Sequence, residues 1–382
     1  MFKTVDRKNT QSIKWNQVIR DDCLPFTIAD SEYESPKPII DALNLRVNHG
    51  VFGYTYFDDT YYQIIINYVK RHYGYSINRS EIITTMGVVG SLFYAIKMLD
   101  AKSEGVIIQT PVYNMFYGLI EKTNKKVIEN KLIEEEGYYK MDFDHLEGLF
   151  AQGYKIMILC NPHNPVGRVY RDEELKRLVL LAKKYDVYLL SDEIHADIIL
   201  NDNKFISLMN YYPLYENMMV FISPSKSFNI AGLHISLVIS KNDYLMETYR
   251  KITEDNFFKN PSLLSITALK AAYKDCDDWL IAQNKHLTNN YRIIQDYFKK
   301  HHPQAILSKV EGTYLLWINL QYLNVSCEEV SKAFMEHHIL MAKGTIYSPD
   351  SEGYFRLNFA CSTEQLLEGL HRLSQTIQLL EK

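Results

Sequence analysis

Residues 223–234 read Ser223-Pro224-Ser225-Lys226-Ser227-Phe228-Asn229-Ile230-Ala231-Gly232-Leu233-His234 and follow a continuous apolar run at residues 218–222. A short apolar run of this kind predicts a buried strand. Ligands of α/β proteins bind just beyond the ends of such strands, and a lysine amine held there can form an imine with a carbonyl compound. A lone lysine after a strand is usually a solvated loop residue, so the role of Lys226 depends on the rest of the chain.

Length and charge narrow the kinds of protein that this chain can be. Its 382 residues suggest about two domains. The net charge of -4 gives no electrostatic sign of binding to nucleic acid or to an anionic membrane. No stretch approaches the ~20 apolar residues of a membrane span, and the polar first residues lack the core of a signal peptide. We therefore expect a cytoplasmic protein that acts on a small molecule.

Cysteine and histidine positions give no sign of a metal site. The five cysteines are scattered without paired or metal-ligand spacing, and the twelve histidines form no zinc-binding pattern. We expect all five thiols to be reduced and mostly structural, and we predict no metal.

Apolar strands alternate with helices along the first two thirds of the chain. Expected strands lie at residues 106–108, 126–128, 154–159, 187–190, 218–222 and 234–239, and expected helices at residues 61–73 and 172–185. Such alternation predicts an α/β domain with a mostly parallel, mixed sheet between helices. A smaller α+β domain follows, with expected helices at 263–272 and 279–300 and strands at 314–319 and 354–358.

These patterns divide the chain into three parts. We expect residues 1–40 to form an N-terminal segment that packs with the small domain. Residues 41–260 form the large domain and residues 261–382 the small C-terminal domain.

Reactive side chains follow three of the expected strands. Residues 161–167 follow one strand, residues 192–195 the next, and Lys226 a third. All of them lie at one edge if the sheet is parallel. Residues 86–91 form a glycine-bearing turn into a helix, which presents backbone amides to a phosphate. With the aromatic ring of Tyr113, this set can hold a phosphorylated aromatic aldehyde.

With this set of residues, the sequence resembles the fold-type I pyridoxal phosphate enzymes of the aspartate aminotransferase superfamily. The resemblance runs nearly from end to end of the chain. The resemblance implies pyridoxal 5′-phosphate as the cofactor and Lys226 as the lysine that forms a Schiff base with it. Asp192 keeps the pyridine nitrogen protonated, so that the ring can accept an electron pair. The other implied cofactor contacts are Val88, Val89, Tyr113, Asn164, His195, Ser223 and Ser225.

Two further roles come from the same resemblance. Tyr54 reaches the phosphate of the neighbouring subunit and counts with Lys226 as a catalytic residue, which implies a homodimer with shared active sites. Arg356 clamps the substrate carboxylate with its two-pronged guanidinium, beside Asn164 and Asp30.

Within this superfamily, several segments resemble the MalY/PatB carbon–sulfur lyases, also called cystathionine β-lyases. These segments are Asp6-Arg7, Lys14-Trp15, Ala29-Asp30 and residues 50–55, 191–197 and 225–233. His195 stands where aminotransferases commonly have a tyrosine, and His234 stands where they have an arginine. Residues 26–33 depart from the lyase pattern, which leaves the substrate preference open.

The resemblance implies β-elimination from L-cystathionine or a related cysteine S-conjugate, giving a thiol, pyruvate and ammonia. Lys226 removes the Cα proton, so we expect burial and nearby positive charge to lower the pKa of its amine. One alternative is a class I/II aminotransferase, which shares every cofactor contact and transfers the amino group to a 2-oxo acid. Another is a protein that works mainly by binding a partner such as a transcription regulator.

Overall fold

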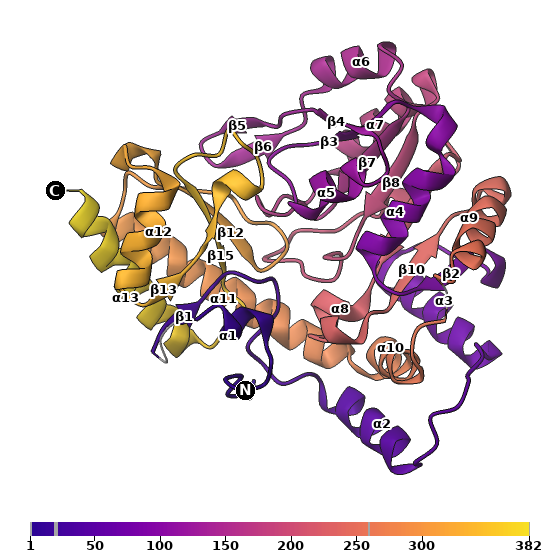
Figure 1. The fold of residues 1–382 in the computed structure, drawn as a ribbon, viewed down its shortest axis with the longest axis horizontal. Helices are drawn as coiled ribbons and strands as arrows, with labels where there is room; N and C mark the ends of the chain where they lie inside the picture. Colours follow the sequence, from indigo (N-terminus) through magenta and orange to yellow (C-terminus); the bar gives the residue numbers. More distant parts are fainter. Residues whose placement is uncertain (1, 19–21, 259, 382) are drawn as a thin grey trace.

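A seven-stranded sheet forms the centre of the larger region of the computed structural model, which describes residues 2–18, 22–258 and 260–381 (Figure 1). Its strand order is β2 (Ile82–Thr85), β10 (Ser236–Ile239), β9 (Met218–Ile222), β8 (Tyr188–Asp192), β7 (Ile156–Cys160), β3 (Gly105–Ile108) and β4 (Lys126–Glu129). Strand β10 is antiparallel to both β2 and β9, and the other neighbours pair in parallel. The predicted mostly parallel, mixed sheet is confirmed, and the carboxyl ends of β2, β7, β8 and β9 share one edge.

Alternate residues of the strands enter two apolar clusters, one on each face of the sheet. On β7, Met157 and Leu159 belong to the first cluster, whereas Ile156 and Ile158 belong to the second. The first cluster includes residues of α2 (Lys37–Asn48), α3 (Asp59–Tyr73), α6 (Phe143–Ala151), α7 (Asp172–Tyr185) and α10 (Leu263–Asp275). The second includes residues of α4 (Val88–Met98), α5 (Met115–Glu121) and α9 (Asp243–Asp255). Because both faces are covered, the central strands β3, β7 and β9 are apolar throughout, which made them recognisable in the sequence.

The smaller region is built on an antiparallel sheet of β11 (Ile306–Leu307), β12 (Leu315–Asn319), β15 (Tyr354–Asn358) and β14 (Ala342–Lys343). A third apolar cluster joins it to α11 (Asp277–His301), α12 (Cys327–Glu336) and α13 (Thr363–Leu380). A short antiparallel hairpin of β5 (Ile133–Glu135) and β6 (Tyr138–Lys140) pairs with no strand of either sheet.

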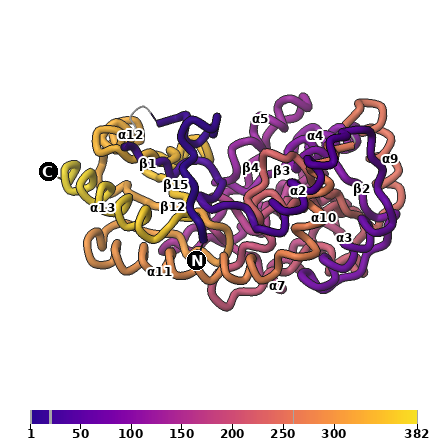
Figure 2. Tube along the Cα trace, turned by 90° about the horizontal axis from the view of Figure 1, so that it is seen from below, coloured from indigo at the N-terminus to yellow at the C-terminus, as the bar shows by residue number. Residues whose placement is uncertain are grey.

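The N-terminal segment joins the two regions. After α1 (Ile13–Asn16), β1 (Leu24–Pro25) pairs in parallel with β13 (Ile339–Leu340) of the smaller region. The chain then crosses to α2 beside the larger region, as Figures 1 and 2 both show. Helix α10 packs against α2 and α3, so a boundary after α10 fits the contacts better than one at residue 260. The three-part division stays a prediction.

Several elements were not expected from the sequence. Helices α5, α6, α9 and α13 went unpredicted, although α13 buries Leu366, Leu370, Leu373 and Ile377 at helical spacing. Strand β10 begins at Ser236, two residues later than expected, because His234 adopts a left-handed backbone with φ of 48°. The expected helix at residues 172–185 and the expected strands at 218–222 and 354–358 are confirmed to the residue.

All five cysteines are buried, and none of them forms a disulfide. Within the described ranges, no helix combines the length and the apolar character needed to cross a membrane.

A buried arginine links the two regions. The guanidinium of Arg168 donates to both carboxylate oxygens of Glu174 on α7, at 2.9 and 2.7 Å, and also pairs with Glu311 ahead of β12. Its Nε donates to the Tyr139 carbonyl at 2.7 Å. The Arg168 side chain is only 1% exposed, so its removal would leave two carboxylates poorly solvated and without their cation.

We expect Arg168→Met to lower the free energy of unfolding by about 3 to 5 kcal/mol, because it removes the cation of a buried charge cluster and leaves the two carboxylates. Urea denaturation measures this loss. Lys37→Met is the control, since Lys37 and Asp41 form an exposed pair on α2 and their separation costs far less. A loss no larger than that of the control would contradict the structural role of Arg168.

Candidate active site

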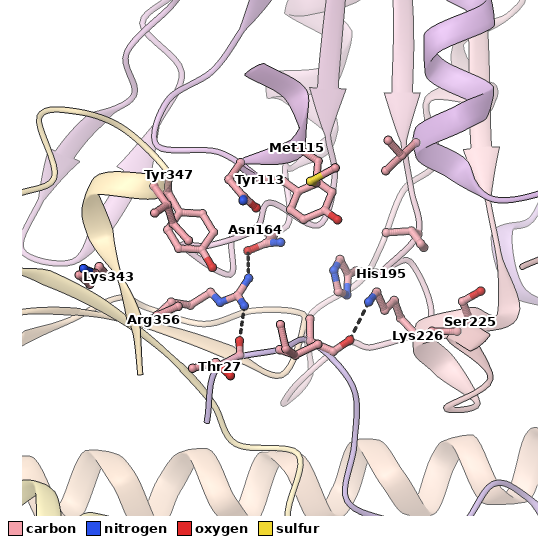
Figure 3. Close-up of a pocket in the computed structure, with 18 of the residues that line it drawn as sticks. Thr27, Tyr113, Met115, Asn164, His195, Ser225, Lys226, Lys343, Tyr347 and Arg356 are labelled. Carbon is pink, nitrogen blue, oxygen red and sulfur yellow. Dashed lines mark hydrogen bonds between the residues drawn. The ribbon is translucent and has the colours of Figure 1, made fainter. Parts of the chain in front are cut away.

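A pocket of about 870 Å³ lies at the carboxyl edge of the seven-stranded sheet, where the two regions meet (Figure 3). The larger region lines it with the turn at Gly87 and with residues that follow β3, β7, β8 and β9. The smaller region adds residues of α12, β13, β14 and β15.

Lys226 enters the pocket from a single helical turn. Strand β9 ends at Ile222, and the Ser223 hydroxyl caps α8 (Pro224–Ser227) by accepting from the Ser225 amide at 3.1 Å. The Lys226 Nζ donates to the Ala29 carbonyl at 2.6 Å. Burial, helped by the charge of Arg356 and opposed by the charges of Asp30 and Asp192, lowers the pKa of this amine to about 8. The direction agrees with the one expected from the sequence.

Asp192 is the last residue of β8 and lies in register with Cys160 of β7 and Phe221 of β9. Its Oδ1 accepts from the Ile194 amide at 3.1 Å. Burial raises the pKa of this carboxyl to about 7, although the Ile194 amide and the charge of Lys226 lower it. A cationic group placed against Asp192 would therefore be strongly favoured, because it would relieve the cost of the buried negative charge.

His195 and Tyr113 supply flat rings to the pocket. Burial lowers the pKa of His195 well below its usual range, and the charges of Lys226 and Arg356 act in the same direction. The His195 Nδ1 has no hydrogen-bond partner among the described residues. Burial raises the pKa of Tyr113 to about 12, and its ring meets Phe116 edge-on at 5.7 Å.

The amino end of α4 forms an anion-binding corner of the pocket. Gly87 precedes this helix with a backbone φ of +107°, which residues other than glycine rarely adopt. No side chain caps the helix. The uncapped amides near Val88 and Val89 therefore face the pocket with the positive end of the helix dipole. The Ser223 and Ser225 hydroxyls also line the pocket and lie 2.6 Å apart.

Arg356 reaches the pocket from β15 of the smaller region. Its Nη1 donates to the Asn164 Oδ1 at 3.1 Å, and its Nη2 donates to the Thr27 carbonyl (Figure 3). The guanidinium lies over the Tyr347 ring, 4.9 Å from its centre. The Nε has no hydrogen-bond partner within the part of the chain that the structure describes. A planar cation in this setting is suited to a carboxylate ligand.

Most of the residues singled out in the sequence come together in this pocket. They are Val88, Val89, Tyr113, Asn164, Asp192, His195, Ser223, Ser225, Lys226 and Arg356.

Two predicted site residues lie elsewhere. Tyr54 is fully exposed and does not line the pocket of its own chain. Asp30 lies just outside the lining, where its carboxylate binds Arg7 at 2.6 Å and approaches Lys14 at 3.5 Å. Tyr54 stays a predicted contact to a second subunit, whereas Asp30 acts on Lys226 through its charge.

Sequence reasoning missed the apolar part of the pocket. Met115, Phe334, Met335, Met341 and Tyr347 line it. Nothing in the sequence distinguishes these residues from ordinary core residues, and Tyr347 is one of 29 tyrosines. The carbonyl groups of Thr27 and Ala29 were also missed, because backbone groups leave no sequence signal.

Comparison with known proteins gives a consistent result. A family described as aminotransferase class I and II matches residues 21–373. Cystathionine beta-lyase PatB from Bacillus subtilis is 30% identical, over 98% of this chain and 99% of its own. Cystalysin from Treponema denticola, whose crystal structure contains pyridoxal 5′-phosphate, has a TM-score of 0.95 and 32% identity, over 99% of this chain and 98% of its own. The pyridoxal-phosphate-bound C–S lyase from Staphylococcus hominis has a TM-score of 0.92 and 29% identity, over 98% of each chain. Because the family match spans most of the sequence, this chain belongs to the aminotransferase class I and II family.

Proposed function

We propose that this protein is a pyridoxal-phosphate-dependent carbon–sulfur β-lyase. Its substrate is L-cystathionine or a related cysteine S-conjugate, and its products are a thiol, pyruvate and ammonia. The observation that carries the proposal is the meeting of Lys226, Asp192 and Arg356 in one pocket. Full-length similarity to a cystathionine beta-lyase supports the sulfur substrate. Five buried, unpaired thiols are compatible with the cytoplasmic location that we propose.

The residues present fit pyridoxal 5′-phosphate. The uncapped end of α4 with Ser223 and Ser225 would hold the phosphate, and the buried Asp192 carboxyl would hold a cationic ring nitrogen. Lys226 offers the amine for covalent attachment, and the unpartnered Nδ1 of His195 offers a further polar contact. Tyr113 and Asn164 would complete the binding site. Bound there, the cofactor supplies an electron sink for negative charge that develops at the substrate Cα.

The chain's own groups then bind the substrate and move its proton. Arg356 binds the carboxylate, and its Nε, which has no hydrogen-bond partner among the described residues, is available as a donor for it. This anchor places the neighbouring Cα toward Lys226, whose neutral amine takes the Cα proton. Asp192 remains ionised beside a cationic ring nitrogen, because the opposite charge offsets its burial.

An aminotransferase is the second candidate, because it uses the same cofactor contacts. It differs in returning the proton to the cofactor instead of expelling a group from Cβ. His195 and His234 both line the pocket at positions where aminotransferases commonly carry tyrosine and arginine. These two residues favour elimination over transfer.

Incubation with L-cystathionine and no 2-oxo acid separates the two candidates. We expect catalytic release of thiol and pyruvate, measured with a thiol reagent and lactate dehydrogenase. Turnover only after addition of a 2-oxo acid would favour the aminotransferase.

Lys226→Ala should abolish turnover and leave the circular dichroism spectrum unchanged, because it removes the amine that takes the Cα proton and no core side chain.

The reactivity of Lys226 should change near pH 8. An amine is nucleophilic only when neutral, which is its state above its pKa, and burial lowers the pKa of Lys226 to about 8. We expect modification of the cofactor-free protein by trinitrobenzenesulfonate at Lys226 to rise through that pH, measured by peptide mass spectrometry. A midpoint near the ~10.4 of a lysine amine in water would contradict the role of burial.

We also propose that two copies of the chain share their active sites. Val51, Phe52, Tyr54 and Tyr56 are exposed on the loop between α2 and α3, and Leu45 is exposed nearby on α2. An exposed group of large apolar side chains is typical of a protein contact. In a dimer, Tyr54 would contact the phosphate in the second subunit.

Mixed dimers test this arrangement. We expect Tyr54→Ala and Lys226→Ala to be nearly inactive alone, and a refolded mixture of the two to recover lyase activity. The recovery arises because one of the two sites in a mixed dimer contains neither substitution. A mixture that stays as inactive as its components would show that Tyr54 acts within its own subunit or not at all.

A further inference from the structure

Residues 27–33, which we call the bridging segment, form no helix or strand, yet their backbone carries bonds from both regions of the molecule. Thr27, Ile28 and Ala29 line the pocket. The segment lies within residues 26–33, which depart from the lyase pattern apart from the shared Ala29-Asp30, and the proposed function leaves its backbone without a role.

Asn229 holds the bridging segment from the larger region. It follows Lys226 by three residues and adopts a left-handed backbone with φ of 55°, which asparagine tolerates better than most residues. Its Nδ2 donates to the carbonyls of Ser31 at 3.2 Å and Tyr33 at 2.8 Å, and its Oδ1 accepts from the Ser31 amide at 3.2 Å. One side chain thus holds three backbone groups of the segment.

Asn358 holds the same segment from the smaller region. It follows Arg356 by two residues on β15 and is 1% exposed. Its Nδ2 donates to the carbonyls of Ile28 at 2.6 Å and Asp30 at 2.7 Å. Its Oδ1 accepts from the Ala360 amide at 2.8 Å, which fixes the direction of the side chain.

The two functional side chains also contact the bridging segment. Lys226 donates to the Ala29 carbonyl, and Arg356 donates to the Thr27 carbonyl, so both contact a stretch of three residues (Figure 3). Each functional residue is therefore followed, two or three residues along the chain, by an asparagine that binds the same segment.

A buried charge cluster fixes the other side of the segment. Lys14 is 1% exposed and pairs with Glu32 at 2.5 Å, and the Trp15 indole donates to Glu32 at 2.9 Å. Arg7 binds both oxygens of Asp30, at 3.0 and 2.6 Å. The resemblance of Asp6-Arg7, Lys14-Trp15 and Ala29-Asp30 to the lyases thus maps largely onto one structural unit.

We infer that the bridging segment sets the spacing between the Lys226 amine and the Arg356 guanidinium, with Asn229 and Asn358 as its positioning residues. The inference rests on the proposed function. In that reaction the carboxylate and the leaving proton belong to neighbouring substrate atoms, so the carboxylate anchor and the base must keep a fixed spacing. Displacement of one group by about 1 Å costs on the order of a hundredfold in rate.

A double-mutant cycle on kcat/KM for L-cystathionine elimination tests the inference. We expect Asn229→Ala and Asn358→Ala each to lower kcat/KM by about tenfold to a hundredfold. The double variant should lose about as much as the worse single variant, because either substitution frees one end of the same segment. If the fold-losses in kcat/KM of the two single variants multiply in the double variant, Asn229 and Asn358 act independently, and the inference is overturned.

Asn130→Ala is the matched control. Asn130 is also fully buried, and it donates to the backbone carbonyl of Asp142 and accepts from Gln109, away from the pocket. We expect this substitution to lower the melting temperature while kcat/KM stays unchanged. A fall in kcat/KM that matches the fall in melting temperature across all variants would reduce Asn229 and Asn358 to ordinary structural residues.

A binding measurement keeps this test independent of catalysis. 3-(Methylthio)propanoate carries a carboxylate and a thioether but no amine, so its binding reports on the carboxylate anchor without imine formation. By titration calorimetry of the cofactor-loaded protein, we expect Asn358→Ala to weaken binding by about tenfold, the equivalent of one lost interaction. Asn130→Ala should bind as the wild type does, and unchanged binding by Asn358→Ala would overturn the inference.

Arg7→Gln supplies a milder substitution if Asn358→Ala does not fold, because Arg7 is partly exposed. It loosens Asp30 from outside, and its effect on kcat/KM should not multiply with that of Asn229→Ala. A wild-type protein that releases no pyruvate from L-cystathionine or from S-methyl-L-cysteine would overturn the proposed function, and the binding measurement would still test the segment. An active wild type whose losses multiply would overturn the role of the segment alone.

Discussion

Parallel pairing of β7, β8 and β9 is the constraint on which the rest of the molecule depends. It brings the carboxyl ends of the three strands to one edge, where Asn164, Asp192 and Lys226 line a single pocket. Reversal of β10 places β2 parallel to β9 and brings the Gly87 turn to the same edge. A covalent anchor, a carboxylate and a helix end thus meet although they lie far apart in the chain.

Burial then sets the charge states at this edge. It lowers the pKa of Lys226 to about 8 and raises that of Asp192 to about 7, because both charged forms lose their water. His195 is driven toward its neutral form for the same reason. The pocket therefore favours a neutral amine as base, and it favours a cationic ligand group that can restore the charge of Asp192.

The second half of the site depends on a connection between the two sheets. Arg356 extends from the antiparallel sheet, and the bridging segment lies between it and Lys226. Two asparagines and a buried charge cluster hold this irregular segment, whose backbone has no strand or helix to satisfy it. Side-chain hydrogen bonds thus take the place of those in a helix or strand, at the part of the pocket wall that contacts both regions.

The sequence alone determined the large mixed sheet, the reactive residues after its strands and the family resemblance. It could do so because the central strands, which are covered on both faces, are mostly continuous apolar runs, and because the residue that follows a strand is a local property of the chain. Only the tertiary structure showed that residues 27–33 lie between Lys226 and Arg356, that Asp30 is bound by Arg7, and that Tyr54 is exposed outside its own pocket. These facts depend on which elements pack together, and such non-local contacts leave no periodic signal in the sequence.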